Sequence, residues 1–174
     1  FHCRTCINRK DTMKHSKKDE PFYRSGLQFE CTKCGKCCTG FPGFVYLSED
    51  DIESIAKFLK MDKGSFIQKY TRNIHVFEEP RLSLIEKPPY DCIFWNKVCT
   101  IYPVRPYQCR SYPFWKRNLI SCREWEKVRN ICPGTGRGRV HSSAEIDAWL
   151  RNTPSYNWKR FSSLPVINSA DKLQ

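Results

Sequence analysis

The sequence lacks any long hydrophobic run. No stretch approaches the roughly 18 apolar residues that a membrane-spanning helix requires, so a transmembrane helix is excluded. The basic segment Phe1–Glu20 has no apolar centre and is therefore not a secretory signal. Internal repeats and low-complexity tracts are also missing, and 174 residues suggest one domain, or one domain with ordered arms.

Motifs of the common catalytic sites are missing as well. The chain contains no G-x-S-x-G, P-loop, H-E-x-x-H or G-x-G-x-x-G sequence. The glycine-rich stretch Gly134–Arg139 follows no predicted strand, and we expect a basic turn there. The four histidines have no paired spacing, although His2 could join Cys3 and Cys6 at a metal centre; the others are His15, His75 and His141. Catalysis by side chains alone is not expected.

Hydrophobic residues make up 40% of the chain, below the usual 45–50% or so, and 14% are aromatic. A lean core of this kind needs a second source of stability, and the 11 cysteines can supply one. Their odd number and C-x-x-C spacing favour metal ligation in a reducing compartment over a disulfide framework. The expected compartment is therefore a bacterial cytoplasm, or a mitochondrial or plastid matrix after removal of a transit peptide, which a first residue other than Met allows.

Four cysteines are concentrated in the run Cys31-Thr-Lys-Cys34-Gly-Lys-Cys37-Cys38. A loop with this spacing can turn three thiolates toward one centre. The bacterial ferredoxin run shares the C-x-x-C-x-x-C spacing but needs a further cysteine four residues on, followed by proline. Here Cys38 follows directly and precedes Thr39. Because adjacent side chains diverge, we expect Cys37 and Cys38 to serve different centres, at least one of them shared with cysteines from later in the chain.

Five more cysteines follow: Cys92, Cys99, Cys109, Cys122 and Cys132. Four from the run and four of these would make two sites of four sulfurs, which suit Zn²⁺ or an iron–sulfur cluster. Cys122 lies inside a predicted helix, where a buried small apolar side chain is the simpler interpretation.

Three segments together resemble the CxxCxxCC cysteine-cluster family of zinc- or iron-chelating domains. They are Phe29–Gly40, Asp91–Trp115 with its Tyr-Pro-Val-Arg-Pro-Tyr-Gln-Cys stretch, and Ile131–Gly138. The resemblance, which runs from about Phe22 to Leu150, implies the metal ligands Cys31, Cys34, Cys37, Cys38, Cys92, Cys99, Cys109 and Cys132. The same motif occurs in flagellin lysine N-methylases, so the resemblance implies metal binding more directly than an activity. Cys3-x-x-Cys6, Cys122 and the basic N-terminal arm depart from the family pattern.

We expect an α+β fold: a small, cysteine-rich, metal-stapled single domain with short helices, a β-hairpin and extended basic terminal arms. The arm covers residues 1–25, the domain 26–152 and the tail 153–174. Helical spacing and capping residues predict helices over 48–59, 65–71, 118–131 and 142–150. Strands are predicted at 74–77 and 81–85, and a hairpin joins 92–95 to 98–102. Pro103, Pro106 and Pro113 are expected to exclude regular structure between them.

The net charge of +12 favours an acidic partner. From Pro103 to Val140, nine Lys or Arg residues stand against two Glu, interleaved with Tyr107, Tyr112, Phe114, Trp115 and Trp125, which suits RNA. The alternative is that these arginines bond around the metal sites and the lysines are solvated. The favoured function is a non-catalytic structural or assembly module of a larger protein or ribonucleoprotein complex. An iron–sulfur oxidoreductase or electron-transfer protein and an accessory to protein methylation are the alternatives.

Overall fold

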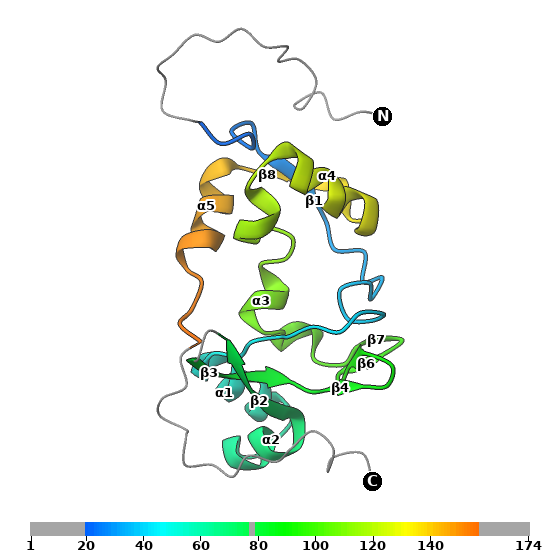
Figure 1. The fold of residues 1–174 in the computed structure, drawn as a ribbon, viewed down its shortest axis with the longest axis vertical. Helices are drawn as coiled ribbons and strands as arrows, with labels where there is room; N and C mark the ends of the chain where they lie inside the picture. Colours follow the sequence, from blue (N-terminus) through cyan, green and yellow to red (C-terminus); the bar gives the residue numbers. More distant parts are fainter. Residues whose placement is uncertain (1–19, 77–78, 157–174) are drawn as a thin grey trace, which may run out of the picture. The chain divides into compact units, whose positions relative to one another are not determined.

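The computed structural model describes residues 20–76 and 79–156, which form short helices and two-stranded sheets (Figure 1). The predicted α+β class is confirmed. The described chain divides into two compact units, here called the first unit (residues 20–34 and 113–152) and the second unit (residues 35–112 and 153–156). No helix in these residues has the length and apolar character needed to cross a membrane.

The second unit is built on two helices and a hairpin, close to where the sequence predicts them. Helix α1 (Glu49–Phe58) begins with a capping box between Ser48 and Asp51, and α2 (Lys63–Tyr70) is capped by Asp62. Strands β2 (Thr71–Val76) and β3 (Glu79–Leu84) then pair antiparallel, with Arg72 opposite Ser83. The core between them consists of Leu47, Ile52, Ile55, Ala56, Phe66, Leu82, Leu84, Phe94 and Ile101.

The predicted hairpin over 92–102 is replaced by two smaller ladders. Strand β4 (Glu86–Lys87) pairs with β5 (Asp91–Cys92), and β6 (Trp95–Asn96) pairs with β7 (Val98–Cys99). The turn between β6 and β7 is very tight, since Lys97 alone separates the paired residues and adopts a positive φ of 58°. Cys92 and Cys99 therefore belong to different ladders.

The expectation that prolines exclude regular structure is wrong for Pro103 and Pro106. Pro103 stands in the first turn of the 3-10 helix η1 (Tyr102–Val104), and Pro106 is the N-cap of α3 (Tyr107–Arg110). At these positions a missing backbone N–H costs nothing, because the first N–H groups of a helix have no partner within it. Helix α3 carries Cys109, so this correction concerns the candidate site directly.

The first unit contains β1 (Leu27–Phe29), η2 (Lys116–Leu119), α4 (Cys122–Ile131), β8 (Thr135–His141) and α5 (Ser143–Arg151). The helix predicted over 118–131 is divided, because Ser121 caps α4 at its start. The basic turn expected at Gly134–Arg139 is largely wrong, because β8 pairs with β1. Gln28 lies opposite Val140 and Phe29 opposite Thr135, so the residues between 135 and 140 form a bulge with Gly136 and Gly138 at positive φ.

A separate core fills the first unit. It consists of Tyr23, Leu27, Phe114, Leu119, Trp125 and Ile146. The Tyr23 hydroxyl donates a hydrogen bond to Asp147 at 3.0 Å, which fixes the segment before β1 against α5. A terminal arm reaching to residue 25 therefore extends too far, since Tyr23 belongs to this core. Residues 1–19, with Cys3 and Cys6, and the tail residues 157–174 lie outside the described residues.

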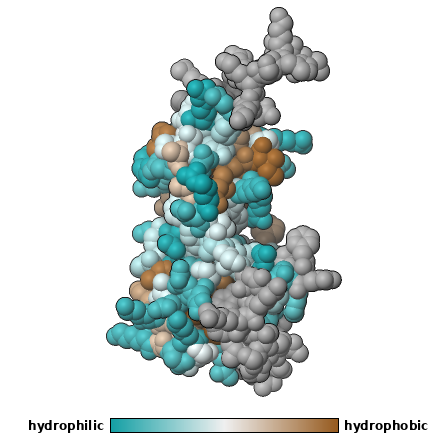
Figure 2. Space-filling view, turned by 90° about the vertical axis from the view of Figure 1, so that its left-hand side faces the viewer, coloured by the Kyte–Doolittle hydropathy of each residue, from teal (hydrophilic) through white to brown (hydrophobic). Residues whose placement is uncertain are grey.

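Hydrophilic side chains predominate among the described residues on the face shown in Figure 2 and surround small hydrophobic patches. The large hydrophobic side chains exposed in the described chain include Phe41, 84% exposed, and Ile120, 73% exposed. Phe41 lies three residues after Cys38, and apart from adjacent residues nothing lies within 4 Å of the place that a Cβ would take at Gly40 or Gly43. Residues 40–43 are therefore open to solvent.

Candidate metal centre

The two units divide the eight predicted ligands unequally. The second unit contains five of them, here called the five-thiol group: Cys37, Cys38, Cys92, Cys99 and Cys109. The first unit contains Cys31, Cys34 and Cys132. The boundary falls between Cys34 and Gly35, inside the cysteine run itself.

Cys37 and Cys38 converge instead of diverging. Their Sγ atoms lie 3.6 Å apart, so the expectation that neighbouring side chains must point to different places is wrong here. The cause is a tight turn in which the Cys38 amide donates to the Gly35 carbonyl at 2.7 Å. Gly35 has a φ of 76°, and a Cβ there would come within 2.2 Å of the Trp95 ring, so only glycine fits.

Backbone pairing connects this turn to a later cysteine. The amide of Cys92, in β5, donates to the carbonyl of Cys38 at 2.7 Å. Cys99 lies on β7, where it pairs with Trp95, the residue that packs on Gly35. Cys109 is supplied by α3. Four chain segments thus contribute to the five-thiol group.

The pKa values of the thiols reveal their mutual proximity. Burial raises the pKa of Cys109 well above its usual range, and the neighbouring thiols of Cys92, Cys37 and Cys99 raise it further. Burial also raises the pKa of Cys92 to about 11, with Cys99 and Cys37 acting in the same direction. Every thiolate formed here opposes the ionisation of the next.

Cys37 is the exception. A hydrogen bond from the Cys38 thiol lowers the pKa of Cys37 to about 7, and the positive charge of Arg105 contributes. The same hydrogen bond raises the pKa of Cys38, since it holds the proton there, and burial adds to the effect. Of these two neighbouring thiols, one therefore ionises readily, whereas ionisation of both is unfavourable.

The donor set fits a thiophilic metal. Sulfur ligands suit Zn²⁺ and iron–sulfur clusters, and a bound cation compensates the repulsion between thiolates that raises these pKa values. Within residues 20–76 and 79–156, no three Cys, His, Asp or Glu side chains stand close enough to hold one ion together. Among the described residues, the thiols are gathered but not closed around a common point.

Two cations accompany the five-thiol group. Arg105 donates from Nε to the Tyr102 carbonyl at 3.0 Å, and its guanidinium lies 3.6 Å from the centre of the Tyr102 ring. Lys87 donates from Nζ to the Trp95 carbonyl and lowers the pKa of Cys92. A tetrathiolate site with Zn²⁺ has a net charge of about −2, which two nearby cations would offset. Sequence reasoning missed Lys87, although its two-residue strand pairs with the one that carries Cys92.

The three ligand candidates of the first unit lie on two segments that approach closely. The Glu30 amide donates to the Gly134 carbonyl at 3.0 Å, and a Cβ on Gly134 would meet the Glu30 carbonyl oxygen at 2.2 Å. Cys31 directly follows Glu30, and Cys132 stands two residues before Gly134.

Cys122 is excluded from sharing an ion with Cys132. It begins α4, whereas Cys132 directly follows the end of that helix, and a rise of 1.5 Å per residue separates the two cysteines by about 15 Å along the axis. That distance is too long for two ligands of one metal. Cys122 is partly buried, which agrees only in part with the buried side chain expected from the sequence.

Comparison with known protein families also indicates a metal-chelating domain. Residues 30–133 match the model of the CxxCxxCC family, described as a "Putative zinc- or iron-chelating domain". The chain belongs to the CxxCxxCC family. The matched range contains all eight predicted ligands and Cys122, whereas Cys3 and Cys6 precede it.

The chain is similar in sequence to the uncharacterized protein MJ0661 of Methanocaldococcus jannaschii. It is 30% identical over 111 residues, which are 62% of this chain and 57% of that protein. The match therefore spans little more than half of the relative's length. No solved structure matches this member of the CxxCxxCC family.

Proposed function

We propose that the chain is a metal-binding module whose second unit holds one Zn²⁺ ion or iron–sulfur cluster through four sulfurs of the five-thiol group. The observation that carries this proposal is the convergence of Cys37 and Cys38, 3.6 Å apart, on a segment bonded to Cys92. Cys99 raises the pKa of Cys92, and Cys92 and Cys99 both raise the pKa of Cys109, which extends the group to four segments. Arg105 and Lys87 would balance its charge.

A metal held in this way would act structurally. It would join four segments of the second unit that share only short ladders and turns, and structural tetrathiolate sites supply on the order of 10 kcal/mol of apparent folding free energy. The role that follows is a non-catalytic structural or assembly module. The function needs reduced thiols, so we assign the chain to a reducing intracellular compartment.

An iron–sulfur electron-transfer role is the second candidate. It is favoured by the exposure of Cys37, which would place an edge of a cluster near solvent, where an electron-transfer partner could approach. An absorbance band near 400 nm in anaerobically purified protein supports this second role, whereas a colourless protein that releases zinc supports the structural one.

The partner we propose is a larger protein or ribonucleoprotein assembly with an acidic surface. Phe114 and Trp125 cannot stack on RNA bases, since they stack on each other in the core with ring centres 6.0 Å apart. Trp115 is only half-buried, and the Arg117 guanidinium lies 4.6 Å from its ring centre. Contact with RNA would therefore depend mainly on phosphate, and a steep loss of affinity with added salt tests it.

Thiol protection tests the metal centre. Protein purified anaerobically is treated with iodoacetamide before and after metal removal, and the alkylated cysteines are identified by mass spectrometry. The proposal predicts that metal protects four of the five second-unit thiols, while Cys122 reacts equally in both forms. Because Cys92 and Cys109 ionise only in base, the reaction is run at alkaline pH, and equal reaction of Cys92, Cys99 and Cys109 there with and without metal would contradict the proposal.

A further inference from the structure

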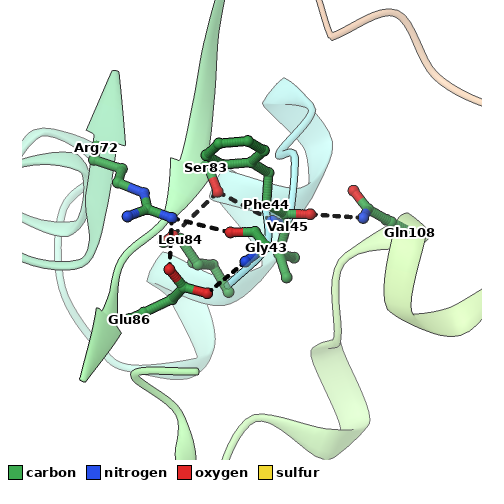
Figure 3. A network of polar contacts seen from close by, with 8 residues as sticks. All are labelled: Gly43, Phe44, Val45, Arg72, Ser83, Leu84, Glu86 and Gln108. Atoms are coloured by element: carbon green, nitrogen blue, oxygen red, sulfur yellow. Dashed lines mark hydrogen bonds and ion pairs between the residues drawn. The ribbon is translucent and has the colours of Figure 1, made fainter. Parts of the chain in front are cut away.

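Hydrogen bonds hold several backbone groups of residues 43–47, a segment that follows the cysteine run, and Figure 3 shows those at residues 43–45. At Gly43 the amide donates to Glu86 at 2.8 Å and the carbonyl accepts from Arg72 at 2.9 Å. Arg72 and Glu86 also form an ion pair at 2.8 Å. This pair therefore holds both polar groups of one residue, five positions after Cys38.

Strand β3 holds the next residues from one side. The Val45 amide donates to the Ser83 hydroxyl at 3.0 Å, and the Val45 carbonyl accepts from the Leu84 amide at 3.0 Å. The Leu47 amide donates to the Leu82 carbonyl at 3.1 Å. The segment therefore lies along the edge of β3 as an irregular third strand.

On the side of this segment that faces away from β3, the Gln108 side chain makes the hydrogen bonds that a further strand would make. Its Oε1 accepts from the Tyr46 amide at 2.8 Å. Its Nε2 donates to the Phe44 carbonyl at 2.8 Å, a contact drawn in Figure 3. A backbone amide can only donate and a carbonyl can only accept, so the orientation of the Gln108 side chain is determined. No shorter or apolar side chain would satisfy both groups.

Gln108 belongs to α3, which has only four residues and cannot be stable by itself. Its first amide, that of Tyr107, donates to Asp51 Oδ1 at 2.8 Å. Asp51 is 3% exposed, and its other oxygen accepts from the amide and hydroxyl of Ser48. Two side-chain contacts, from Asp51 and Gln108, thus hold the helix that carries Cys109.

We propose that Gln108 is a positioning residue for the metal centre, one that holds Cys109 in register with the segment carrying Cys37 and Cys38. This inference rests on the proposed function. The Gln108 side chain acts through the backbone of the neighbouring segment, at Phe44 and Tyr46, and through its place beside Cys109. The ligands are brought together by hydrogen bonds before a metal arrives, so part of the ordering cost of binding is already met by the fold.

Gln108→Met tests the proposal, because methionine has a similar volume and makes neither hydrogen bond. Gln28→Met in the first unit is the matched control, since it removes only one exposed bond to Gly138. Both variants and the original protein are titrated anaerobically with Co²⁺ in competition with a chelator, and the thiolate-to-cobalt absorbance is recorded. We expect Gln108→Met to lower Co²⁺ affinity about 10- to 100-fold and to change the absorbance, as loss of outer-shell support does elsewhere. Gln28→Met should match the original protein.

A merely structural role predicts a different result. In that case Gln108→Met lowers the unfolding temperature of the metal-free protein, but the folded variant binds Co²⁺ with unchanged affinity and spectrum, and the proposal is overturned. If Gln108→Met does not fold, Gln108→Asn replaces it. Asparagine keeps the amide but is one methylene shorter, so it cannot reach both the Tyr46 amide and the Phe44 carbonyl, and it should also lower Co²⁺ affinity. Unchanged Co²⁺ affinity and spectrum in a folded Gln108→Asn variant overturn the proposal.

These outcomes are distinguishable from failure of the proposed function. If the original protein and Gln28→Met give no thiolate-to-cobalt absorbance, the metal centre itself is wrong. If both give it and Gln108→Met gives it equally, only the role of Gln108 is wrong.

Discussion

The Cys92 amide donates a hydrogen bond to the Cys38 carbonyl at 2.7 Å, which joins the two main cysteine segments through their backbones. Because this contact needs no metal, the thiols of Cys38 and Cys92 are neighbours in the fold itself. The metal proposed for this group would therefore bind to a partly assembled site instead of creating it.

Substitutions at three glycines test the turn that brings Cys37 and Cys38 together. A strained backbone conformation alone costs about 1–3 kcal/mol. Gly35→Ala should lower the free energy of unfolding by more than that, because a positive φ of 76° and a collision with Trp95 add to one another. Gly40→Ala has a positive φ but open space, so about 1–2 kcal/mol is expected. Gly43→Ala has neither problem and should be almost neutral. Urea unfolding measures all three, and equal effects at Gly35 and Gly43 would contradict this account of the turn.

Asp51→Asn should destabilise the second unit by about 1–3 kcal/mol, since the buried carboxylate accepts bonds from Ser48 and Tyr107 that an amide cannot fully replace. The exposed neighbour Asp50 is the matched control, and Asp50→Asn should change stability by less than about 0.5 kcal/mol. Thermal unfolding of the metal-free protein measures the difference. Similar effects of the two substitutions would show that Asp51 acts only through the charge of the first turn of α1.

Alkylation of the metal-free protein should depend on pH differently at two cysteines. The pKa of Cys37 is lowered to about 7 and that of Cys92 raised to about 11, so iodoacetamide should modify Cys37 at neutral pH and Cys92 only in strong base. The lowered pKa of Cys37 also implies a stabilising contribution that is present above the pKa of the unfolded thiol and is lost as the pH falls through 7. Peptide mapping after timed alkylation at pH 6, 7 and 8 tests this order. Equal rates at both cysteines would refute it.

Metal removal should lower the unfolding temperature without abolishing the helices. The second unit retains a core of its own around Phe66 and Ile101, and bound metal adds stability that grows with the logarithm of its concentration relative to its dissociation constant. Circular dichroism before and after treatment with a chelator under reducing conditions measures both quantities. An unchanged unfolding temperature would show that the metal does not staple the fold.

Local signals allowed part of this fold to be predicted. The capping boxes at Ser48 and Ser142 predict α1 and α5 because the interactions involved lie within one turn of the chain. Strand β8 could not be predicted in this way, since its partner β1 is more than a hundred residues away and its sequence is rich in glycine and arginine. Long-range pairing decided the structure of that segment.

The candidate site, too, could be predicted only where local signals determine it. The family resemblance and the C-x-x-C spacing identify the cysteines, but not how they are grouped. The convergence of Cys37 and Cys38 depends on Trp95 packing against Gly35, and the position of Cys109 depends on Asp51 and Gln108. None of these contacts has a signature in the spacing of the cysteines, because each joins segments distant in sequence.

The most direct test of the central claim is native mass spectrometry of the full chain after anaerobic metal loading. We expect the double substitution Cys92→Ser and Cys109→Ser to remove or sharply weaken the binding of one whole metal centre, because it leaves only three sulfurs in the five-thiol group. Cys122→Ser should keep the full complement, because Cys122 lies about 15 Å along α4 from Cys132, the nearest predicted ligand on its segment. An unchanged metal content in the double variant, or the same loss in Cys122→Ser, would contradict the proposed centre.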